Sequence, residues 1–275
     1  MFQLIKLNFQ IIWKRGRFLN YLMFLTFAAS IISFLLYFGK SSSLFGNNMD
    51  SFFLLSGELN TFAVFFLYLL PLFVTYPEGD IGIIERKLYP QIYTKVKASK
   101  YHYAKAITVF LVGFAVMFYF LSLLYLFSYI MTSHTNTLFY TWSAIFPNNP
   151  SVTEVGFGLL LLNYPILQHF LYIFFICIYG GLMAVTSYVL SLFVRSKILS
   201  YAGPFFISVF IALGMNMIGG NLRNWYPQQV LNPMAPRLIV EGIFTLEFGI
   251  FVSFFVISLV LILLIRFKTM RIAKN

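Results

Sequence analysis

Six apolar stretches that contain no acidic or basic side chain constrain the fold of this chain more than any other feature. They lie near residues 18–38, 61–76, 106–131, 170–194, 199–218 and 248–265. A helix needs roughly 20 apolar residues to cross the ~30 Å hydrocarbon core of a membrane. The second stretch is short and contains Pro71, but the apolar residues before it can lengthen it. The sequence therefore predicts an all-α integral membrane protein with six transmembrane helices.

The composition excludes a soluble globular protein. Hydrophobic residues make up 60% of the chain and charged residues 10%, whereas soluble domains carry about 25% charged residues. The single cysteine, Cys177, excludes an intrachain disulfide. We therefore expect residues 1–275 to form a single transmembrane domain.

The basic residues predict the orientation of the six helices. If the N-terminus is cytoplasmic, Lys and Arg are concentrated on the inner side, and only Lys40, Arg223 and Arg237 lie outside. Such a bias indicates that both termini face the cytoplasm. It also accounts for the net charge of +11, so nucleic acid is not an expected partner. This topology gives three outer loops and one large cytoplasmic segment: 39–60, 132–169, 219–247 and 77–105.

Two further segments are expected to interact with the membrane. Apolar residues recur at helical spacing in the first residues, at Phe2, Ile5, Phe9 and Ile12, opposite basic and polar side chains. This pattern predicts an amphipathic helix on the inner leaflet rather than a frayed tail. The Gly-, Pro- and aromatic-rich loop 219–247 cannot cross as a regular helix, and we expect it to re-enter the outer face of the membrane.

Motifs for catalysis, metal binding and nucleotide binding are missing from the sequence. The three histidines lie on different segments with no second ligand at metal-site spacing. Gly39-Lys40-Ser41 resembles the end of a P-loop, but Phe34 stands where the first glycine is required. We therefore expect a protein that is not an enzyme and that binds no cofactor itself. All eight acidic residues lie outside the six stretches, which disfavours an ion-coupled carrier.

Residues 70–110 contain a series of short motifs around the cytoplasmic segment. Pro71 is followed by Pro77-Glu78-Gly79-Asp80, Glu85-Arg86-Lys87, Ile92-Tyr93-Thr94-Lys95 and Tyr101-His102-Tyr103-Ala104-Lys105. This series resembles the permeases of ABC-2 type exporters, in particular the small permeases of low-GC Gram-positive bacteria. It departs from them at Lys95, where Arg is commoner, and at Tyr89-Pro90, which replaces a Gly-bearing turn.

The resemblance implies the permease subunit of an ATP-driven exporter in the bacterial cell membrane. Two permeases, either identical or this chain with a sibling, would assemble with two copies of a cytosolic ATPase, and the ATPase would bind ATP and Mg²⁺. The aromatic content of 20% favours an amphiphilic cargo, such as a hydrophobic peptide or a lipid-like molecule. Two alternatives stay open: a membrane subunit of a sensing or immunity complex for antimicrobial peptides, and an ion-coupled carrier.

The same resemblance implies a coupling helix within residues 77–105. Pro90 suits the first turn of a helix, which we expect over residues 90–98. Ile92, Tyr93 and Val96 would be apolar anchors in a groove of the ATPase, and we expect the spans to bury none of them. The flanking charged residues would lie at the rim of this interface, where solvent and salt screen them. The residues expected to couple are Asp80, Glu85, Pro90, Ile92, Tyr93, Lys95, Val96, Tyr101 and Lys105. The alternative is a basic loop held near anionic lipid.

Overall fold

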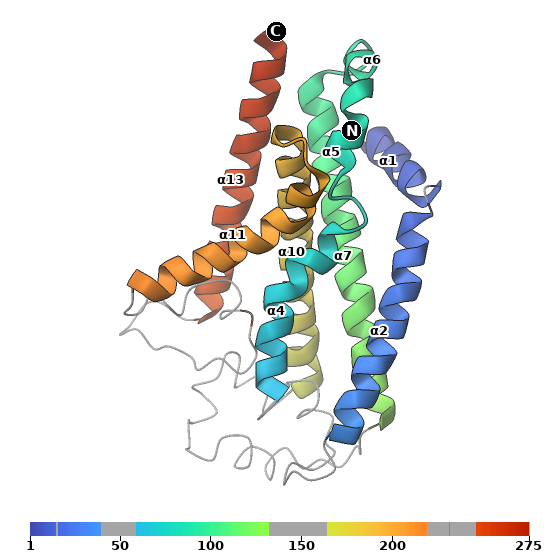
Figure 1. Cartoon of the computed structure of the whole chain (residues 1–275), viewed down its shortest axis with the longest axis vertical. Coiled ribbons are helices and arrows are strands. Elements are labelled where there is room, and N and C mark those ends of the chain that lie inside the picture. The colour runs from blue at the N-terminus through green and yellow to red at the C-terminus, as the bar shows by residue number, and fades with distance from the viewer. Residues whose placement is uncertain (15, 40–58, 132–163, 219–230, 232–245, 275) are drawn as a thin grey trace.

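The computed structural model describes residues 1–14, 16–39, 59–131, 164–218, 231 and 246–274. All secondary structure in these residues is helical, which confirms the predicted all-α class (Figure 1). The long helices are α1 (Phe2–Lys14), α2 (Arg17–Gly39), α4 (Leu59–Thr75), α7 (Ala98–Met131), α10 (Pro165–Phe193), α11 (Lys197–Ile218) and α13 (Leu246–Lys274). The short ones are α5 (Ile81–Ile84), the 3₁₀ helix η1 (Glu85–Leu88) and α6 (Tyr89–Tyr93).

Within the described residues, four helices, α7, α10, α11 and α13, are long and apolar enough to cross a membrane. Helices α1 and α2 together make a fifth candidate, bent by 65° at the break between them. Each of the six predicted stretches overlaps one long helix, but the boundaries differ. Helix α7 begins at Ala98 rather than 106, and α13 continues to Lys274 rather than 265. The number of long apolar helices is therefore that of a multi-pass membrane protein.

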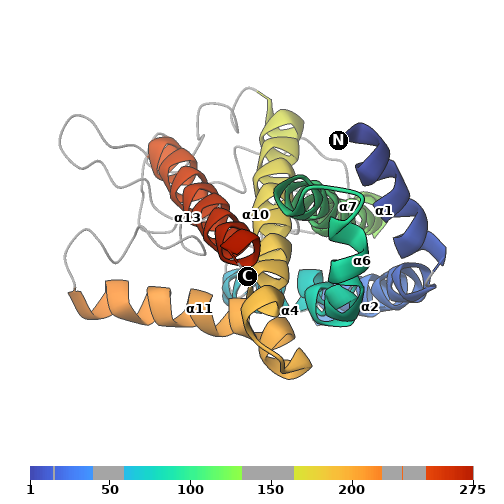
Figure 2. The ribbon, with the colours of Figure 1, turned by 90° about the horizontal axis from the view of Figure 1, so that it is seen from above.

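Helix α10 is the centre of the bundle. It packs against α4, α7, α11 and α13, and in Figure 2 it lies between α7 on one side and α11 and α13 on the other. Its tyrosines at positions 172, 179 and 188 are completely buried. Helix α11 runs obliquely across the other long helices (Figure 1). The core is thus built around one helix, which is buried over most of its surface.

Small residues bring α7 and α10 into close contact. Gly113 of α7 faces Gly180, Gly181 and Ala184 of α10. A Cβ atom added at Gly113 would lie 2.6 Å from the Cβ of Ala184 and 3.1 Å from the carbonyl oxygen of Gly180. Small residues at such positions let helix backbones approach closely, which strengthens packing where the surrounding medium is as apolar as the side chains.

The predicted N-terminal amphipathic helix is present as α1. Its buried side chains, Asn8 and Ile12, face the bundle, whereas Phe2 and Trp13 are 80% and 66% exposed. Gly16 adopts a positive φ of 67° in the turn before α2, a conformation that glycine adopts without steric cost. An exposed aromatic face on a helix that turns away from the next span is what an interfacial helix requires.

One end of the bundle carries the start of α1, the end of α13 and the short helices α5, η1 and α6 (Figure 1). We call it the polar end. The predicted re-entrant segment 219–247 and the loops 39–60 and 132–169 lie almost entirely outside the described residues.

Candidate functional site

The segment between α4 and α7 folds over the polar end of the bundle as α5, η1 and α6 in succession (Figure 1). The predicted helix over 90–98 is wrong in length, because α6 ends at Tyr93. The N–H groups of Lys95 and Val96 both bond to the carbonyl oxygen of Ile92, at 3.0 Å each. These two hydrogen bonds to one carbonyl oxygen form a turn that ends α6. Helix α7 then begins at Ala98.

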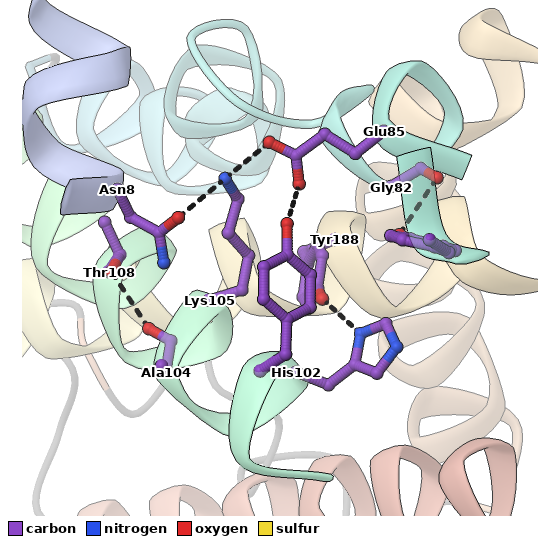
Figure 3. A network of polar contacts seen from close by, with 10 residues as sticks. Asn8, Gly82, Glu85, His102, Ala104, Lys105, Thr108 and Tyr188 are labelled. Atoms are coloured by element: carbon purple, nitrogen blue, oxygen red, sulfur yellow. Dashed lines mark hydrogen bonds and ion pairs between the residues drawn. The ribbon is translucent and has the colours of Figure 1, made fainter. Parts of the chain in front are cut away.

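Glu85, the first residue of η1, is the centre of a buried polar network (Figure 3). Lys105 Nζ donates to Glu85 Oε1 at 2.7 Å and to Asn8 Oδ1 at 3.3 Å. The Tyr101 hydroxyl donates to Glu85 Oε2 at 2.5 Å. Lys105 is completely buried and Glu85 is 4% exposed. A buried ion pair of this kind is tolerated when its geometry is good and further hydrogen bonds satisfy the charged groups, and both conditions hold here.

Asp80 joins the same segment to two other helices. Its carboxylate lies 3.4 Å from Arg17 Nη1 at the start of α2 and 3.9 Å from Lys197 Nζ at the start of α11. Asp80 is 2% exposed, while both cations reach it from more exposed positions. The single carboxylate therefore connects α5 to both α2 and α11.

Arg86 attaches η1 to the end of α10. Its Nη2 donates to the carbonyl oxygens of Ser191, Leu192 and Val194 at 2.9, 3.2 and 3.0 Å. The last carbonyls of a helix lack intrahelical partners and carry its negative dipole end. A guanidinium at this position both satisfies the carbonyls and complements the dipole.

His102 completes the network beneath α6. Its Nδ1 lies 2.7 Å from the Tyr188 hydroxyl of α10, and its Nε2 lies 2.7 Å from the Tyr93 hydroxyl of α6. A singly protonated imidazole needs one donor and one acceptor, and tyrosine hydroxyls can act as either. Burial raises the pKa of Tyr93 to about 12, so its hydroxyl keeps its proton at neutral pH.

Close contacts at Gly79 hold the chain just before α5 against α10 and α11. The Ser200 hydroxyl donates to the Gly79 carbonyl, and the Ser187 hydroxyl donates to the Ser200 carbonyl at 2.6 Å. A Cβ atom at Gly79 would lie 2.6 Å from the Thr75 carbonyl oxygen and 2.8 Å from the Tyr201 ring. Glycine is therefore required for the segment to lie this close to the bundle.

The structure changes the predicted roles of several site residues. Ile92, Tyr93 and Val96 are half-buried against the core, so the prediction that the spans bury none of them is wrong. Burial of apolar area against the bundle is available without a partner, and these side chains take it. Asp80, Glu85 and Lys105 are buried, so the prediction that they are screened rim charges is also wrong. Tyr101 is buried with them.

The exposed side chains of residues 85–96 are a different set. We call it the outer edge, and it consists of Lys87, Leu88, Pro90, Gln91, Thr94 and Lys95. Leu88 is 49% exposed. Pro90 and Lys95 were predicted as coupling residues and keep positions where a partner can reach them.

Several residues of the network were not predicted from the sequence: Asn8, Arg17, Arg86, His102, Tyr188 and Lys197. One signal was present. Tyr101 and Lys105 are four residues apart, and such residues lie on one face of a helix, where a single carboxylate can meet both. The described residues contain no group of three or more His, Cys, Asp or Glu side chains arranged to hold a metal ion.

Comparison with protein-family models, with curated proteins and with solved structures finds no match to this chain.

Proposed function

We propose that this chain is the transmembrane permease subunit of an ATP-driven exporter, with six spans and the polar end in the cytoplasm. A cytosolic ATPase would dock on the outer edge, and two permeases and two ATPases would form the complete exporter. The support is the motif series over residues 70–110 together with a multi-pass helical bundle. Helices α2 and α4 supply the two spans beyond the four that length and composition identify.

The observation that carries the proposal is the attachment of residues 77–105 to the bundle. Buried and partly buried hydrogen bonds and ion pairs link this segment to α1, α2, α7, α10 and α11 through Asn8, Arg17, Lys105, the last carbonyls of α10 and Lys197. Each of these contacts is directional and lies at or near the polar end. A displacement of the outer edge by a partner would therefore move several helix ends together, as coupling of ATP hydrolysis to the spans requires.

The cargo proposed for this exporter is amphiphilic. The described spans are predominantly apolar, and their charged side chains are gathered at the polar end. An unpaired charge on the cargo would find no partner along such a wall and would be costly to desolvate. A hydrophobic peptide or a lipid-like molecule, moving between two permeases, meets no such cost.

The test is purification of the tagged full-length chain from its native membrane in mild detergent. We expect an ATPase with nucleotide-binding motifs to co-purify, and Lys95→Glu on the outer edge to weaken its binding at least tenfold. Lys14→Glu is the matched control, because Lys14 is equally a basic, exposed residue but lies on α1. Absence of any ATPase, or equal losses in the two variants, would contradict the proposal.

A second measurement examines the energy source once a cargo is known. In reconstituted vesicles, transport should continue in the presence of a protonophore as long as ATP is supplied. It should stop when the catalytic carboxylate of the ATPase is replaced. Transport that collapses with the proton gradient while ATP is maintained would instead identify an ion-coupled carrier.

A further inference from the structure

The segment between α4 and α7 separates its charges by sign. Its three acidic residues, Glu78, Asp80 and Glu85, are only 4%, 2% and 4% exposed. Four basic residues of the same segment are exposed to solvent instead: Lys87, Lys95, Lys97 and Lys100. Residues 77–105 therefore present cations to solvent and no carboxylate side chain.

The positive charge of this surface is not neutralised by the fold. Inside, Lys105 pairs with Glu85, and Arg17 and Lys197 approach Asp80. The ion pairs within the described part of the chain involve none of the four exposed lysines. Retention of basic residues on the cytoplasmic side accounts for the lysines, but it places no constraint on acidic residues. It does not account for a surface from which every carboxylate of the segment is withdrawn.

An apolar side chain lies among these cations on the outer edge. Leu88 is 49% exposed, and its neighbours Lys87 and Pro90 are exposed as well. Protein interfaces commonly combine an apolar centre with a polar or charged rim. The outer edge has this composition, with Leu88 available as the anchor and Lys87 and Lys95 as charges of the rim.

The outer edge also stands beyond the level expected for the membrane surface. Helix α1 carries the exposed aromatic residues Phe2 and Trp13, which suit the interface between lipid and water. Along the long axis of the bundle, α6 lies farther out than α1 (Figure 1). Pro90 and Gln91 of the outer edge belong to α6. A cytosolic protein therefore reaches this surface more readily than the lipid head groups do.

We propose that the outer edge docks on an acidic face of its protein partner, where carboxylates surround an apolar socket for Leu88. This inference rests on the proposed function, in which the partner is the ATPase. Opposite charges on the two faces accelerate their encounter, and they disfavour any partner whose docking face is basic. The burial of Leu88 in the socket then slows dissociation of the complex.

Binding kinetics test the proposal with the ATPase that co-purifies with the full-length chain. The chain is placed in nanodiscs of phosphatidylcholine, a lipid without net charge, and the purified ATPase is added. We expect the association rate constant to fall about tenfold when the salt concentration rises from about 0.05 M to about 0.5 M. At low salt, Lys87→Gln with Lys95→Gln should lower this rate constant about tenfold and weaken its salt dependence.

Three variants complete the design. Lys6→Gln with Lys14→Gln removes the same charge from exposed positions of α1 and should leave association nearly unchanged. Lys87→Arg with Lys95→Arg keeps the charge and should associate like the parent. Leu88→Ala should raise the dissociation rate constant about tenfold and leave the salt dependence of association intact. Thermal unfolding verifies that each variant is as stable as the parent.

The contrary results are distinct from one another. If no ATPase co-purifies, the proposed function fails and the acidic partner fails with it. If an ATPase binds at a rate that depends neither on salt nor on Lys87 and Lys95, the exporter stands and the acidic docking face is wrong. Equal losses in the outer-edge and α1 double Gln variants would show general attraction to positive charge and would also overturn it.

A last measurement distinguishes protein from lipid at the same surface. A fluorophore on Gln91→Cys, in a chain that also carries Cys177→Ser, reports contact with phosphatidylglycerol that bears a spin label on its head group. We expect no quenching before the ATPase is added. Quenching that is lost in Lys87→Gln with Lys95→Gln would show that these lysines lie on anionic lipid, and the proposal would be wrong.

Discussion

Glu85 illustrates the conditions under which this chain keeps charge away from water. One carboxylate oxygen accepts from Lys105 and the other from Tyr101, and Lys105 also donates to Asn8. An isolated buried ion costs several kcal/mol, and its partner offsets this cost only while both are present. The stability of the polar end should therefore depend on Glu85 and Lys105 as a pair.

This dependence predicts a non-additive effect on unfolding. Glu85→Gln or Lys105→Met alone should lower the free energy of unfolding by about 3–5 kcal/mol, because each leaves a buried charge without its partner. The double variant should lose less than the two single losses added together. Chemical unfolding in detergent micelles measures all three, with Lys95→Met as the exposed control. Strictly additive losses would show that the two residues do not interact.

The half-burial of Ile92 and Tyr93 predicts a folding defect from a variant that would otherwise test only docking. Ile92→Ala with Tyr93→Ala should lower the free energy of unfolding by about 2–4 kcal/mol, because apolar contacts are lost and His102 loses a hydrogen bond. Leu88→Ala on the outer edge is the control and should change stability by less than about 0.5 kcal/mol. A double variant that is as stable as the parent but fails to bind an ATPase would contradict this prediction. It would support the expectation from the sequence that these side chains are docking anchors.

The residue-level network was only partly predictable. Lys105 and Tyr101 were placed in the site from their motif, and Pro90 was correctly assigned to the first turn of a helix. The partners that Lys105 and Asp80 find on other helices were not predicted, because Asn8, Arg17 and Lys197 come from three helices distant in sequence. Because Asp80, Glu85 and Lys105 are charged, the sequence suggested that solvent surrounds them. Burial became apparent only when the segment was folded onto the bundle.

At the scale of helices, the contact between α7 and α10 depends on the absence of side-chain atoms. Gly113 and Gly180 allow the two backbones to approach, and Ala184 fills the space beside Gly113. A rigid methyl group in this contact cannot be accommodated by rotating a side chain. Overpacking of this kind costs about 1–3 kcal/mol.

Gly113→Ala should therefore lower the free energy of unfolding by about 1–3 kcal/mol, although alanine normally favours a helix over glycine. Adding Ala184→Gly removes the facing methyl group and should recover part of the loss. Gly214→Ala in α11 is the control, since a Cβ atom there meets nothing within 4 Å, and it should be neutral or slightly stabilising. Equal responses at positions 113 and 214 would mean that α7 and α10 do not pack closely here.

The helices themselves were more predictable than their ends. Long apolar stretches without charge have few alternatives to a helix in a membrane, and every predicted stretch overlaps one long helix. Helix α7 begins before the apolar stretch at 106, because partners in the fold allow His102 and Lys105 inside the helix. The helix over 90–98 failed for the opposite reason: local turn hydrogen bonds end α6 early.

For the whole molecule, the arrangement of charge gives the bundle two different ends. The described ion pairs and the outer edge lie at the polar end, together with the start of α1 and the end of α13 (Figure 1). Tyr164 and Ile130, at the other end of α10 and α7, are 64% and 68% exposed and apolar or aromatic. Basic residues remain on the cytoplasmic side during insertion, so we expect the polar end to face the cytoplasm.

This assignment predicts the labelling of single cysteines by a membrane-impermeant thiol reagent. Cys177 is completely buried, and Cys177→Ser provides the background. In intact cells, Tyr164→Cys should react, because it lies at the end of α10 away from the polar end. Gln3→Cys on α1 and Gln91→Cys on the outer edge, both at exposed positions, should react only after permeabilisation. Reaction of either cysteine in intact cells would show that the orientation of the bundle is opposite to the one predicted. The outer edge would then face away from any cytosolic ATPase, and the proposed exporter would be excluded together with the topology.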